Sequence, residues 1–312
     1  MSGFDKDLRS IQEARDLAAG AFNAWKGWSS ASQEQVDRVC AAMARVAIDA
    51  SERLGRAAHL ETGYGVPEHK RLKNLFASRN VWESIRDMKT VGVINHDVEN
   101  RIYEIAWPVG VIAALTPSTN PTSTVMYKIL IAVKARNAIV IAPHPAAAKC
   151  CYETARIMAQ AAEDNGAPPG LVSCMQNISL DGTQALMRHK YTALILATGG
   201  TPMVRSAHST GKPAIGVGPG NVPVYVDRSA DLEKAARYIV ASKAFDCSTI
   251  CATEQAVVAD KPIAGRLAEL MQREGAYFTT PEETHQLRTL LFHPDGNMNT
   301  ATVGKPAEYL AA

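Results

Sequence analysis

The sequence lacks the features of membrane, secreted and nucleic-acid-binding proteins. No apolar run approaches the roughly 20 residues that span a bilayer, and the start, MSGFDKDLRS, has no apolar signal-peptide core. The net charge is only +2, from 33 basic and 31 acidic residues, which gives no reason to expect nucleic acid or an anionic membrane as a partner. We therefore expect a cytoplasmic protein whose six cysteines are reduced thiols.

Several common site motifs are also missing. The segment closest to a G-x-G-x-x-G fingerprint is GVGPGN (216–221), whose glycine spacing is wrong, and Pro213 interrupts a possible phosphate-binding loop at Gly211-Lys212. There is no H-E-x-x-H motif, and no second cysteine pair to complete a zinc site with Cys247 and Cys251. We expect no metal.

What is present is a normal globular composition, with 46% hydrophobic and 21% charged residues over 312 positions. Apolar residues at helical spacing predict helices over 5–58 and 71–88, and two strand-like runs at 90–107 predict a hairpin. From there to residue 227, strands alternate with helices. This alternation predicts an α/β fold with a doubly wound parallel sheet, which binds ligands at the carboxyl ends of its strands.

The stretch ASKAFDCSTICATEQAVV (241–258) contains two cysteines four residues apart. Cys251 follows a helical segment and a polar break, and it precedes a strand-like run, so its thiol could project into a cleft. The other cysteines, except Cys247, lie in apolar patterns typical of buried thiols. A reactive thiol needs a pKa below its usual value of about 8.5, and Lys243 is the only nearby cation in the segment. Taken alone, the segment is compatible with a metal half-site, a redox pair, a packed core or a nucleophile.

ICATEQAVV, preceded by ASKAFD, resembles the catalytic-cysteine segment of the aldehyde dehydrogenase superfamily, and most closely its coenzyme A-acylating branch. AWPVGVIAALTPSTNPTST, NAIVIAPHPAA and LATGGTPMVRSAHSTGKPAIGVGPGNVPV resemble further segments of that branch, in the same order. The resemblance covers residues from about 10 to 312. It implies a cofactor-binding domain over 1–240, part of a catalytic domain over 241–312, and an oligomerisation hairpin at 90–107 in a homodimer or homotetramer.

The resemblance also implies roles for individual residues. Cys251 matches the nucleophile that attacks an aldehyde, and its backbone N–H and the side chain of Asn120 match the oxyanion donors. Without the resemblance, Asn120 would be interpreted as a turn residue before Pro121. Hydride transfer to a nicotinamide then leaves a thioester on the sulfur.

The step after the thioester separates the branches of the family. Hydrolytic members carry a glutamate base in an E-L-G-G-type motif, whereas this chain has no carboxylate between Lys212 and Asp227. The resemblance therefore implies that coenzyme A takes the acyl group.

Cofactor contacts are expected at four loops. NAD is the expected cofactor, with NADP also open, because no carboxylate near His144 is placed for the ribose hydroxyl. The candidate residues are Thr116 and Pro117 after the first buried strand, Pro143, His144 and Pro145 under the adenosine ribose, Thr198, Gly199 and Gly200 at the pyrophosphate, and Gly216, Gly218 and Gly220 near the nicotinamide. For the last three, a simple tight turn is the alternative.

Acylating relatives continue beyond the point where this chain ends, so we expect a truncated chain with an exposed sheet edge and weak or no activity. The alternatives are a non-acylating relative that hydrolyses its thioester or reduces an acyl phosphate, an inactive scaffold or assembly subunit, and a protein that binds metal through Cys247 and Cys251. The aldehyde could be acetaldehyde, propanal, succinate semialdehyde or sulfoacetaldehyde. No leader helix of the kind that directs relatives to microcompartments is seen, which favours free cytoplasm.

Overall fold

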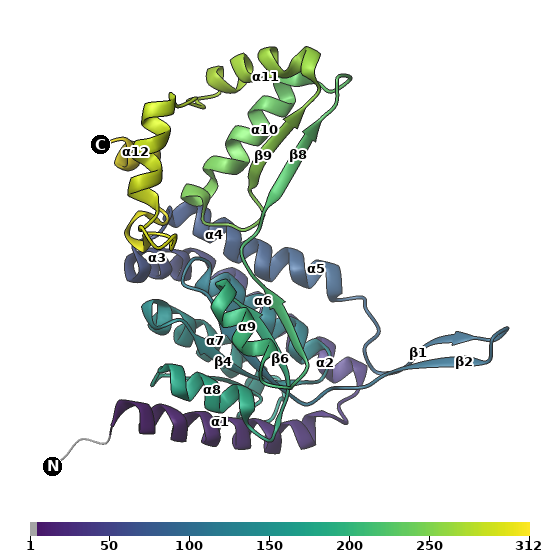
Figure 1. Cartoon of the computed structure of the whole chain (residues 1–312). Helices are drawn as coiled ribbons and strands as arrows, with labels where there is room; N and C mark the ends of the chain where they lie inside the picture. The colour runs from purple at the N-terminus through teal and green to yellow at the C-terminus, as the bar shows by residue number, and fades with distance from the viewer. Residues whose placement is uncertain (1–4) are drawn as a thin grey trace. The chain divides into compact units, whose positions relative to one another are not determined.

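A computed structural model describes residues 5–312, which form two compact units (Figure 1). The larger unit comprises the chain up to Thr62 and Lys70–Gly218, and the smaller unit comprises Gly63–His69 and Pro219–Ala312. The division therefore lies earlier than the expected boundary at residue 240. The roles assigned to the two parts, cofactor binding and catalysis, stay predictions.

The N-terminal region is helical, as predicted, with α1 (Lys6–Trp28), α2 (Gln33–Asp49) and α3 (Ser51–Thr62). The α1 helix buries alanines at three-to-four spacing, including Ala14, Ala18 and Ala21. The α2 helix starts at a capping box, in which the Ser32 hydroxyl accepts the Gln35 N–H and the Gln35 side chain accepts the Ser32 N–H.

The single helix predicted over 71–88 is interrupted. The α4 helix (Pro67–Leu75) is followed by a π-helical turn, η1 (Phe76–Asn80), and then by the short α5 (Val81–Ile85). A π-helical turn contains one more residue than an α-helical turn. This insertion shifts the spacing of apolar residues by less than one turn, so the sequence pattern still looks like one continuous helix.

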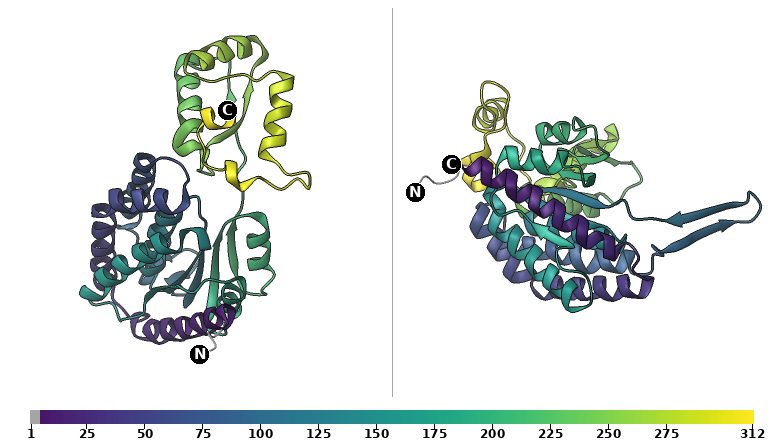
Figure 2. Two further views of the ribbon diagram at one scale, coloured as in Figure 1. Left: turned by 90° about the vertical axis from the view of Figure 1, so that its left-hand side faces the viewer. Right: turned by 90° about the horizontal axis from the view of Figure 1, so that it is seen from below.

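The predicted hairpin is confirmed, with β1 (Gly92–Asp97) and β2 (Ile102–Ala106) paired antiparallel. It extends away from the rest of the larger unit (Figure 2). Tyr103, Ile105 and Trp107 alternate along the chain, so they share one face, and each is more than half exposed.

Five parallel strands form the sheet of the larger unit, in the order β5-β4-β3-β6-β7, which confirms the predicted doubly wound fold. The strands are β3 (Val111–Thr116), β4 (Ala138–Pro143), β5 (Val172–Cys174), β6 (Thr192–Thr198) and β7 (Ala214–Val217). Strand β7 was not predicted, because it lies within a glycine-rich segment. The chain leaves β3 in one direction and returns to β6 on its other side, so the topological switch point lies between these two strands.

Helices cover both faces of this sheet (Figure 1). Right-handed crossovers place α6 (Pro121–Lys134) and α7 (Ala148–Asp164) on one face, where they pack against α2, and α8 (Leu180–Arg188) and α9 (Thr201–His208) on the other. The α1 helix packs against α8 and the central strands. Every residue of β3 and β4 is buried, so the apolar runs of both strands form the middle of the core.

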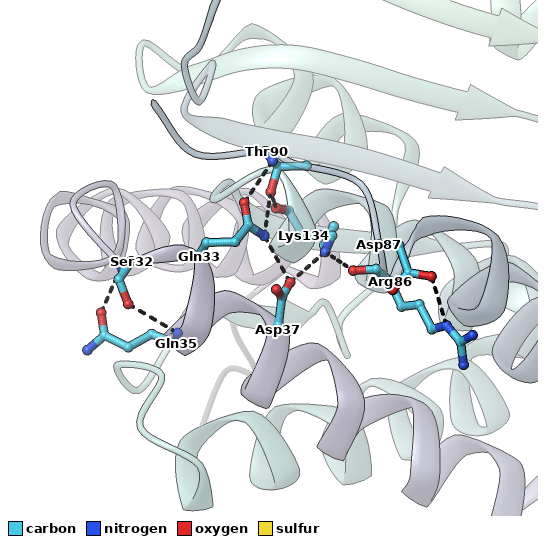
Figure 3. A network of polar contacts seen from close by, with 8 residues as sticks. All are labelled: Ser32, Gln33, Gln35, Asp37, Arg86, Asp87, Thr90 and Lys134. Atoms are coloured by element: carbon cyan, nitrogen blue, oxygen red, sulfur yellow. Dashed lines mark hydrogen bonds and ion pairs between the residues drawn. The ribbon is translucent and has the colours of Figure 1, made fainter. Parts of the chain in front are cut away.

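A partly buried polar network joins α2 to the end of α6 (Figure 3). The Lys134 ammonium donates to the Asp37 carboxylate at 2.5 Å and to the Arg86 carbonyl oxygen at 2.7 Å. The Thr90 hydroxyl donates to the Lys134 carbonyl, and the Thr90 N–H donates to the Gln33 side-chain oxygen. This lysine is structural, since its partners tie helices together.

The smaller unit contains a second, two-stranded parallel sheet made of β8 (Val222–Val226) and β9 (Glu254–Ala259). The run VPVYVD (222–227) was expected as the last strand of the alternating α/β region. It does not belong to the first sheet. Its strand pairs with β9 through the crossover helix α10 (Leu232–Ala244), and α10 and α11 (Lys261–Arg273) supply the apolar side chains packed around Val226. The 3₁₀ turn η3 (Phe245–Ser248) precedes β9, and α12 (Pro281–Leu291), η4 (Thr300–Thr302) and α13 (Ala307–Ala311) follow α11.

Candidate active site

The turn before Cys251 has an unusual backbone. Asp246, Cys247 and Ser248 all have positive φ, at 52°, 51° and 61°, although none is glycine. A left-handed conformation costs roughly 1–2 kcal/mol for an L-residue, and such outliers are concentrated at functional sites. Three in succession require strong support from the surroundings.

A buried carboxylate supplies that support. Asp246 is fully buried, and its carboxylate accepts hydrogen bonds from the Val66 N–H at 2.6 Å and from the Thr249 hydroxyl at 2.7 Å. Its own N–H donates to His69 Nδ1 at 2.9 Å, and the His69 ring stacks on Phe245. The turn is therefore held from both ends by groups of the smaller unit.

Cys251 follows this turn, three residues before the start of β9, and is exposed. A side chain at Gly220 would meet the Cys251 carbonyl oxygen at 2.2 Å, so only glycine lets the start of β8 approach the cysteine this closely. Cys247 is only half-buried. Among the described residues, no group of three or more histidine, cysteine or acidic side chains could hold a metal.

The remaining cysteines differ sharply from Cys251, since all four are buried. Burial raises the pKa of Cys40 to about 12 and raises that of Cys174 as well. Hydrogen bonding to Cys151, followed by burial, raises the pKa of Cys150. Thiols of this kind are packed and unreactive at neutral pH, as the sequence patterns indicated.

Asn120 is the N-cap of α6, at the carboxyl-end side of the larger sheet, and it makes no side-chain capping bond. Its side-chain oxygen accepts a hydrogen bond from the Lys73 ammonium at 2.7 Å, and its Nδ2 donates to Thr119 Oγ1 at 3.2 Å. The amide is therefore fixed in orientation rather than used to cap the helix.

The other predicted residues of the larger unit gather at the carboxyl ends of β3, β4 and β6. The His144 N–H donates to the Thr116 carbonyl at 3.1 Å, which joins the loops after β3 and β4, where Pro117, Pro143 and Pro145 also lie. Desolvation lowers the pKa of His144, so its exposed ring stays largely neutral at pH 7.

The third of these loops leads from β6 into α9. Thr198 ends β6 and its hydroxyl lies 3.5 Å from the Tyr127 hydroxyl, Gly199 donates to the Val217 carbonyl, and Gly200 is the N-cap of α9. No side chain among the described residues caps this helix, so its first N–H groups fit an anionic pyrophosphate.

The three glycines of GVGPGN have different surroundings. A side chain at Gly216, in β7, would meet Val204 at 2.5 Å, so this glycine permits close packing of α9 on the sheet. Gly218 has open space around it, and Gly220 lies against Cys251 as described. None of the three has a positive φ, so a left-handed backbone is not what requires glycine at these positions. The approach to a nicotinamide stays a prediction.

The structure brings the predicted residues together in two sets, the carboxyl-end loops with Asn120 in the larger unit and Cys251 with Gly220 in the smaller. Sequence reasoning missed Lys73, His69 and Asp246 as supporting residues. Asp246 had a signal, since it lies in the FD pair of the segment that carried the resemblance. No sequence signal pointed to Lys73, because it lies 47 positions before its partner Asn120 in the chain.

Known proteins resemble this chain in both sequence and fold. The model of the aldehyde dehydrogenase family matches residues 5–283. An acetylating aldehyde dehydrogenase from Geobacillus thermoglucosidasius superposes with a TM-score of 0.95 at 50% identity, over 99% of this chain and 68% of that one. A Rhodopseudomonas palustris propionaldehyde dehydrogenase, solved with bound CoA and an acylated cysteine, has a TM-score of 0.83 at 32% identity, over 95% of this chain and 68% of that one.

Among curated proteins, the aldehyde-alcohol dehydrogenase of Clostridium acetobutylicum is 41% identical over 99% of this chain. The match covers 34% of that protein, so the chain spans about a third of the length of this relative. In the described residues, no helix is long and apolar enough to cross a membrane.

Proposed function

The chain belongs to the aldehyde dehydrogenase family, and on that premise we propose that it carries out the coenzyme A-acylating oxidation of a short-chain aldehyde. The observation that carries the proposal is the exposed Cys251 thiol, placed after a left-handed turn that a buried Asp246 holds in position. The four buried cysteines offer no comparable nucleophile.

The reaction begins when the Cys251 thiolate attacks the carbonyl carbon, forming a C–S bond and moving an electron pair onto the oxygen. The Cys251 N–H and the Asn120 amide are the donors proposed for this oxyanion. The oxyanion then collapses with loss of hydride, which oxidises the carbon and leaves a thioester on Cys251. When bound, NAD or NADP supplies the hydride acceptor for this step.

The residues suited to hold that cofactor are at the strand ends of the larger unit. The uncapped N-terminus of α9 at Gly200 fits the pyrophosphate, and the loops at Thr116 and His144 are placed for the nucleoside. Gly216 and Gly218 stay candidates near the nicotinamide.

The acyl group is transferred when the coenzyme A thiolate attacks the carbonyl carbon of the thioester. A new C–S bond forms to coenzyme A, and the Cys251 thiolate leaves. The absence of a carboxylate between Lys212 and Asp227 supports this fate over hydrolysis, since nothing in that segment can take a proton from water.

One observation favours the hydrolytic alternative. Glu254 lies three residues after Cys251, and its Oε2 is buried with no hydrogen-bond partner in the described structure. A carboxylate in this position could serve as a base for water, in which case the product would be a free acid.

The test is NADH formation from acetaldehyde or propanal, with and without coenzyme A, and identification of the product by mass spectrometry. We expect turnover only with coenzyme A, and a loss of at least about 1,000-fold in Cys251→Ala, because the nucleophile is removed. Cys247→Ala is the matched control and should keep activity within about 10-fold.

Turnover without coenzyme A, abolished in Glu254→Gln, would establish the hydrolytic alternative instead. No turnover from folded protein under either condition would support the inactive scaffold. We further propose a cytoplasmic homodimer or homotetramer assembled through the β1–β2 hairpin.

A further inference from the structure

The helix α4 presents three polar side chains to the interior of the larger unit. Lys70, Lys73 and Asn74 are only 3%, 6% and 1% exposed. Lysine is almost never fully buried unless it has a partner, because removing an ammonium group from water is costly. Two such residues within one helical turn therefore need a reason.

Asn74 fixes the position of this turn. Its Nδ2 donates to the Ser51 carbonyl at 2.9 Å, and its Oδ1 accepts from the Thr122 hydroxyl at 2.7 Å. These bonds tie α4 to the start of α3 and to the first turn of α6. The π-helical turn η1 starts two residues later, as such turns frequently do beside functional sites.

Both lysines are directed at the loop before α6. Lys70 donates to the Thr119 carbonyl at 3.2 Å, and Lys73 donates to Asn120 Oδ1 at 2.7 Å. The two ammonium groups therefore hold consecutive residues, and Ser123 lies beside them.

The Lys73 contact decides which way the Asn120 amide faces. An ammonium group has only donors, so the atom against it must be the amide oxygen, and the NH₂ group is turned away. One of its two hydrogens is directed to Thr119 Oγ1 at 3.2 Å, and the second can be donated to a substrate. The positive charge on the oxygen side also polarises the amide and strengthens its N–H as a donor.

We propose that Lys73 is a positioning residue, which orients and polarises Asn120 so that its N–H meets the oxyanion of the aldehyde adduct. The inference rests on the proposed function, since it gives Asn120 the donor role there. Lys73 acts on the transition state through Asn120, so its loss should lower kcat more than it raises KM.

The test is a double-mutant cycle in the 312-residue chain, with kcat and KM measured for acyl-CoA formation. Asn120→Ala should lower kcat about 100-fold or more, the usual effect of removing one oxyanion donor. Lys73→Met should lower kcat by roughly 10- to 100-fold with KM for NAD changed less than about 3-fold. The double variant should match Asn120→Ala within about 3-fold, because Lys73 has nothing left to orient.

Lys134→Met is the matched control for removing a buried lysine from the same unit. Its partners are Asp37 and the Arg86 carbonyl (Figure 3), so it should lower Tm while leaving kcat unchanged. Lys73→Gln provides a second test if Lys73→Met does not fold, since its amide can still donate to Asn120 and should retain part of kcat.

Multiplicative losses in the double variant, or an unchanged kcat in folded Lys73→Met, would overturn the inference. Failure of both Lys73 variants to fold, beside a folded Lys134→Met, would also overturn it by showing a purely structural role. Failure of the proposed function is distinct, because it would appear in the unmodified protein as an absence of acyl-CoA formation.

Discussion

At the residue scale, Lys128 is a lysine that the fold buries almost completely. The residue is 1% exposed, and its Nζ donates to the Leu115 carbonyl at 2.7 Å and to the Leu196 carbonyl at 2.8 Å. Burial lowers the pKa of Lys128 to about 7. A neutral amine still has two hydrogens, so both bonds to β3 and β6 survive deprotonation.

This shift predicts a pH dependence of stability. Between pH 7 and 10.5 the unfolded chain binds a proton at Lys128 that the folded chain has lost, so the free energy of unfolding should rise with pH. The full penalty of the charged form applies below pH 7. Urea unfolding should therefore give a free energy of unfolding that rises by roughly 1.4 kcal/mol per pH unit between pH 7 and 10, a total of a few kcal/mol. This rise should be smaller in Lys128→Met. Parallel curves for the two proteins would contradict the prediction.

At the element scale, the turn η3 stores backbone strain that a substitution can release. Ser248 is exposed and has a φ of 61°, which is unfavourable for serine and accessible to glycine. We expect Ser248→Gly to raise the free energy of unfolding by up to about 1 kcal/mol, because relief of the left-handed penalty exceeds the added entropy of the unfolded chain.

Thermal unfolding of Ser248→Gly and Ser248→Ala checks this expectation. Alanine also removes the hydroxyl but keeps the unfavourable φ, so it should bring no gain. A gain of equal size in both variants would show that the hydroxyl, rather than the backbone, is responsible.

The elements also show where sequence patterns stop being informative. The strand β7 was missed because glycine and proline surround it, and it becomes a strand only by pairing with β6. The strand β8 was predicted as a strand but was assigned to the wrong sheet. An apolar run indicates a strand without indicating which strand it pairs with. The π turn in the predicted helix over 71–88 left no signal in the hydrophobic pattern.

At the scale of the whole molecule, the β1–β2 hairpin is the surface that we propose for oligomerisation. Tyr103, Ile105 and Trp107 form an exposed apolar face, and Ile105 lies opposite Val93 in the paired strand. We expect Ile105→Lys to lower the mass measured by sedimentation equilibrium from a dimer or tetramer to a monomer, because a charge would be buried in the contact.

Glu104→Lys is the matched control, since Glu104 points to the opposite face of β2 and should leave the mass unchanged. A monomeric unmodified protein, or an equal loss in both variants, would contradict the role of this face.

The sequence by itself determined the doubly wound sheet, the helical N-terminus, the hairpin and the family. These features follow from local periodicity and from contiguous motifs such as ICATEQ. Such patterns can be recognised in a single sequence because they consist of neighbouring residues. It also distinguished Cys251 from the buried cysteines, because a polar break precedes it.

Only the tertiary structure decided what surrounds these residues. Asp246 meets Val66 from 180 positions away, and Lys73 meets Asn120 from 47. The bond of Lys73 to Asn120 and the strain held by Asp246 depend on contacts that no local pattern encodes. The physical reason is that burial of a charge, or of a left-handed turn, is stable only when partners distant in sequence arrive together.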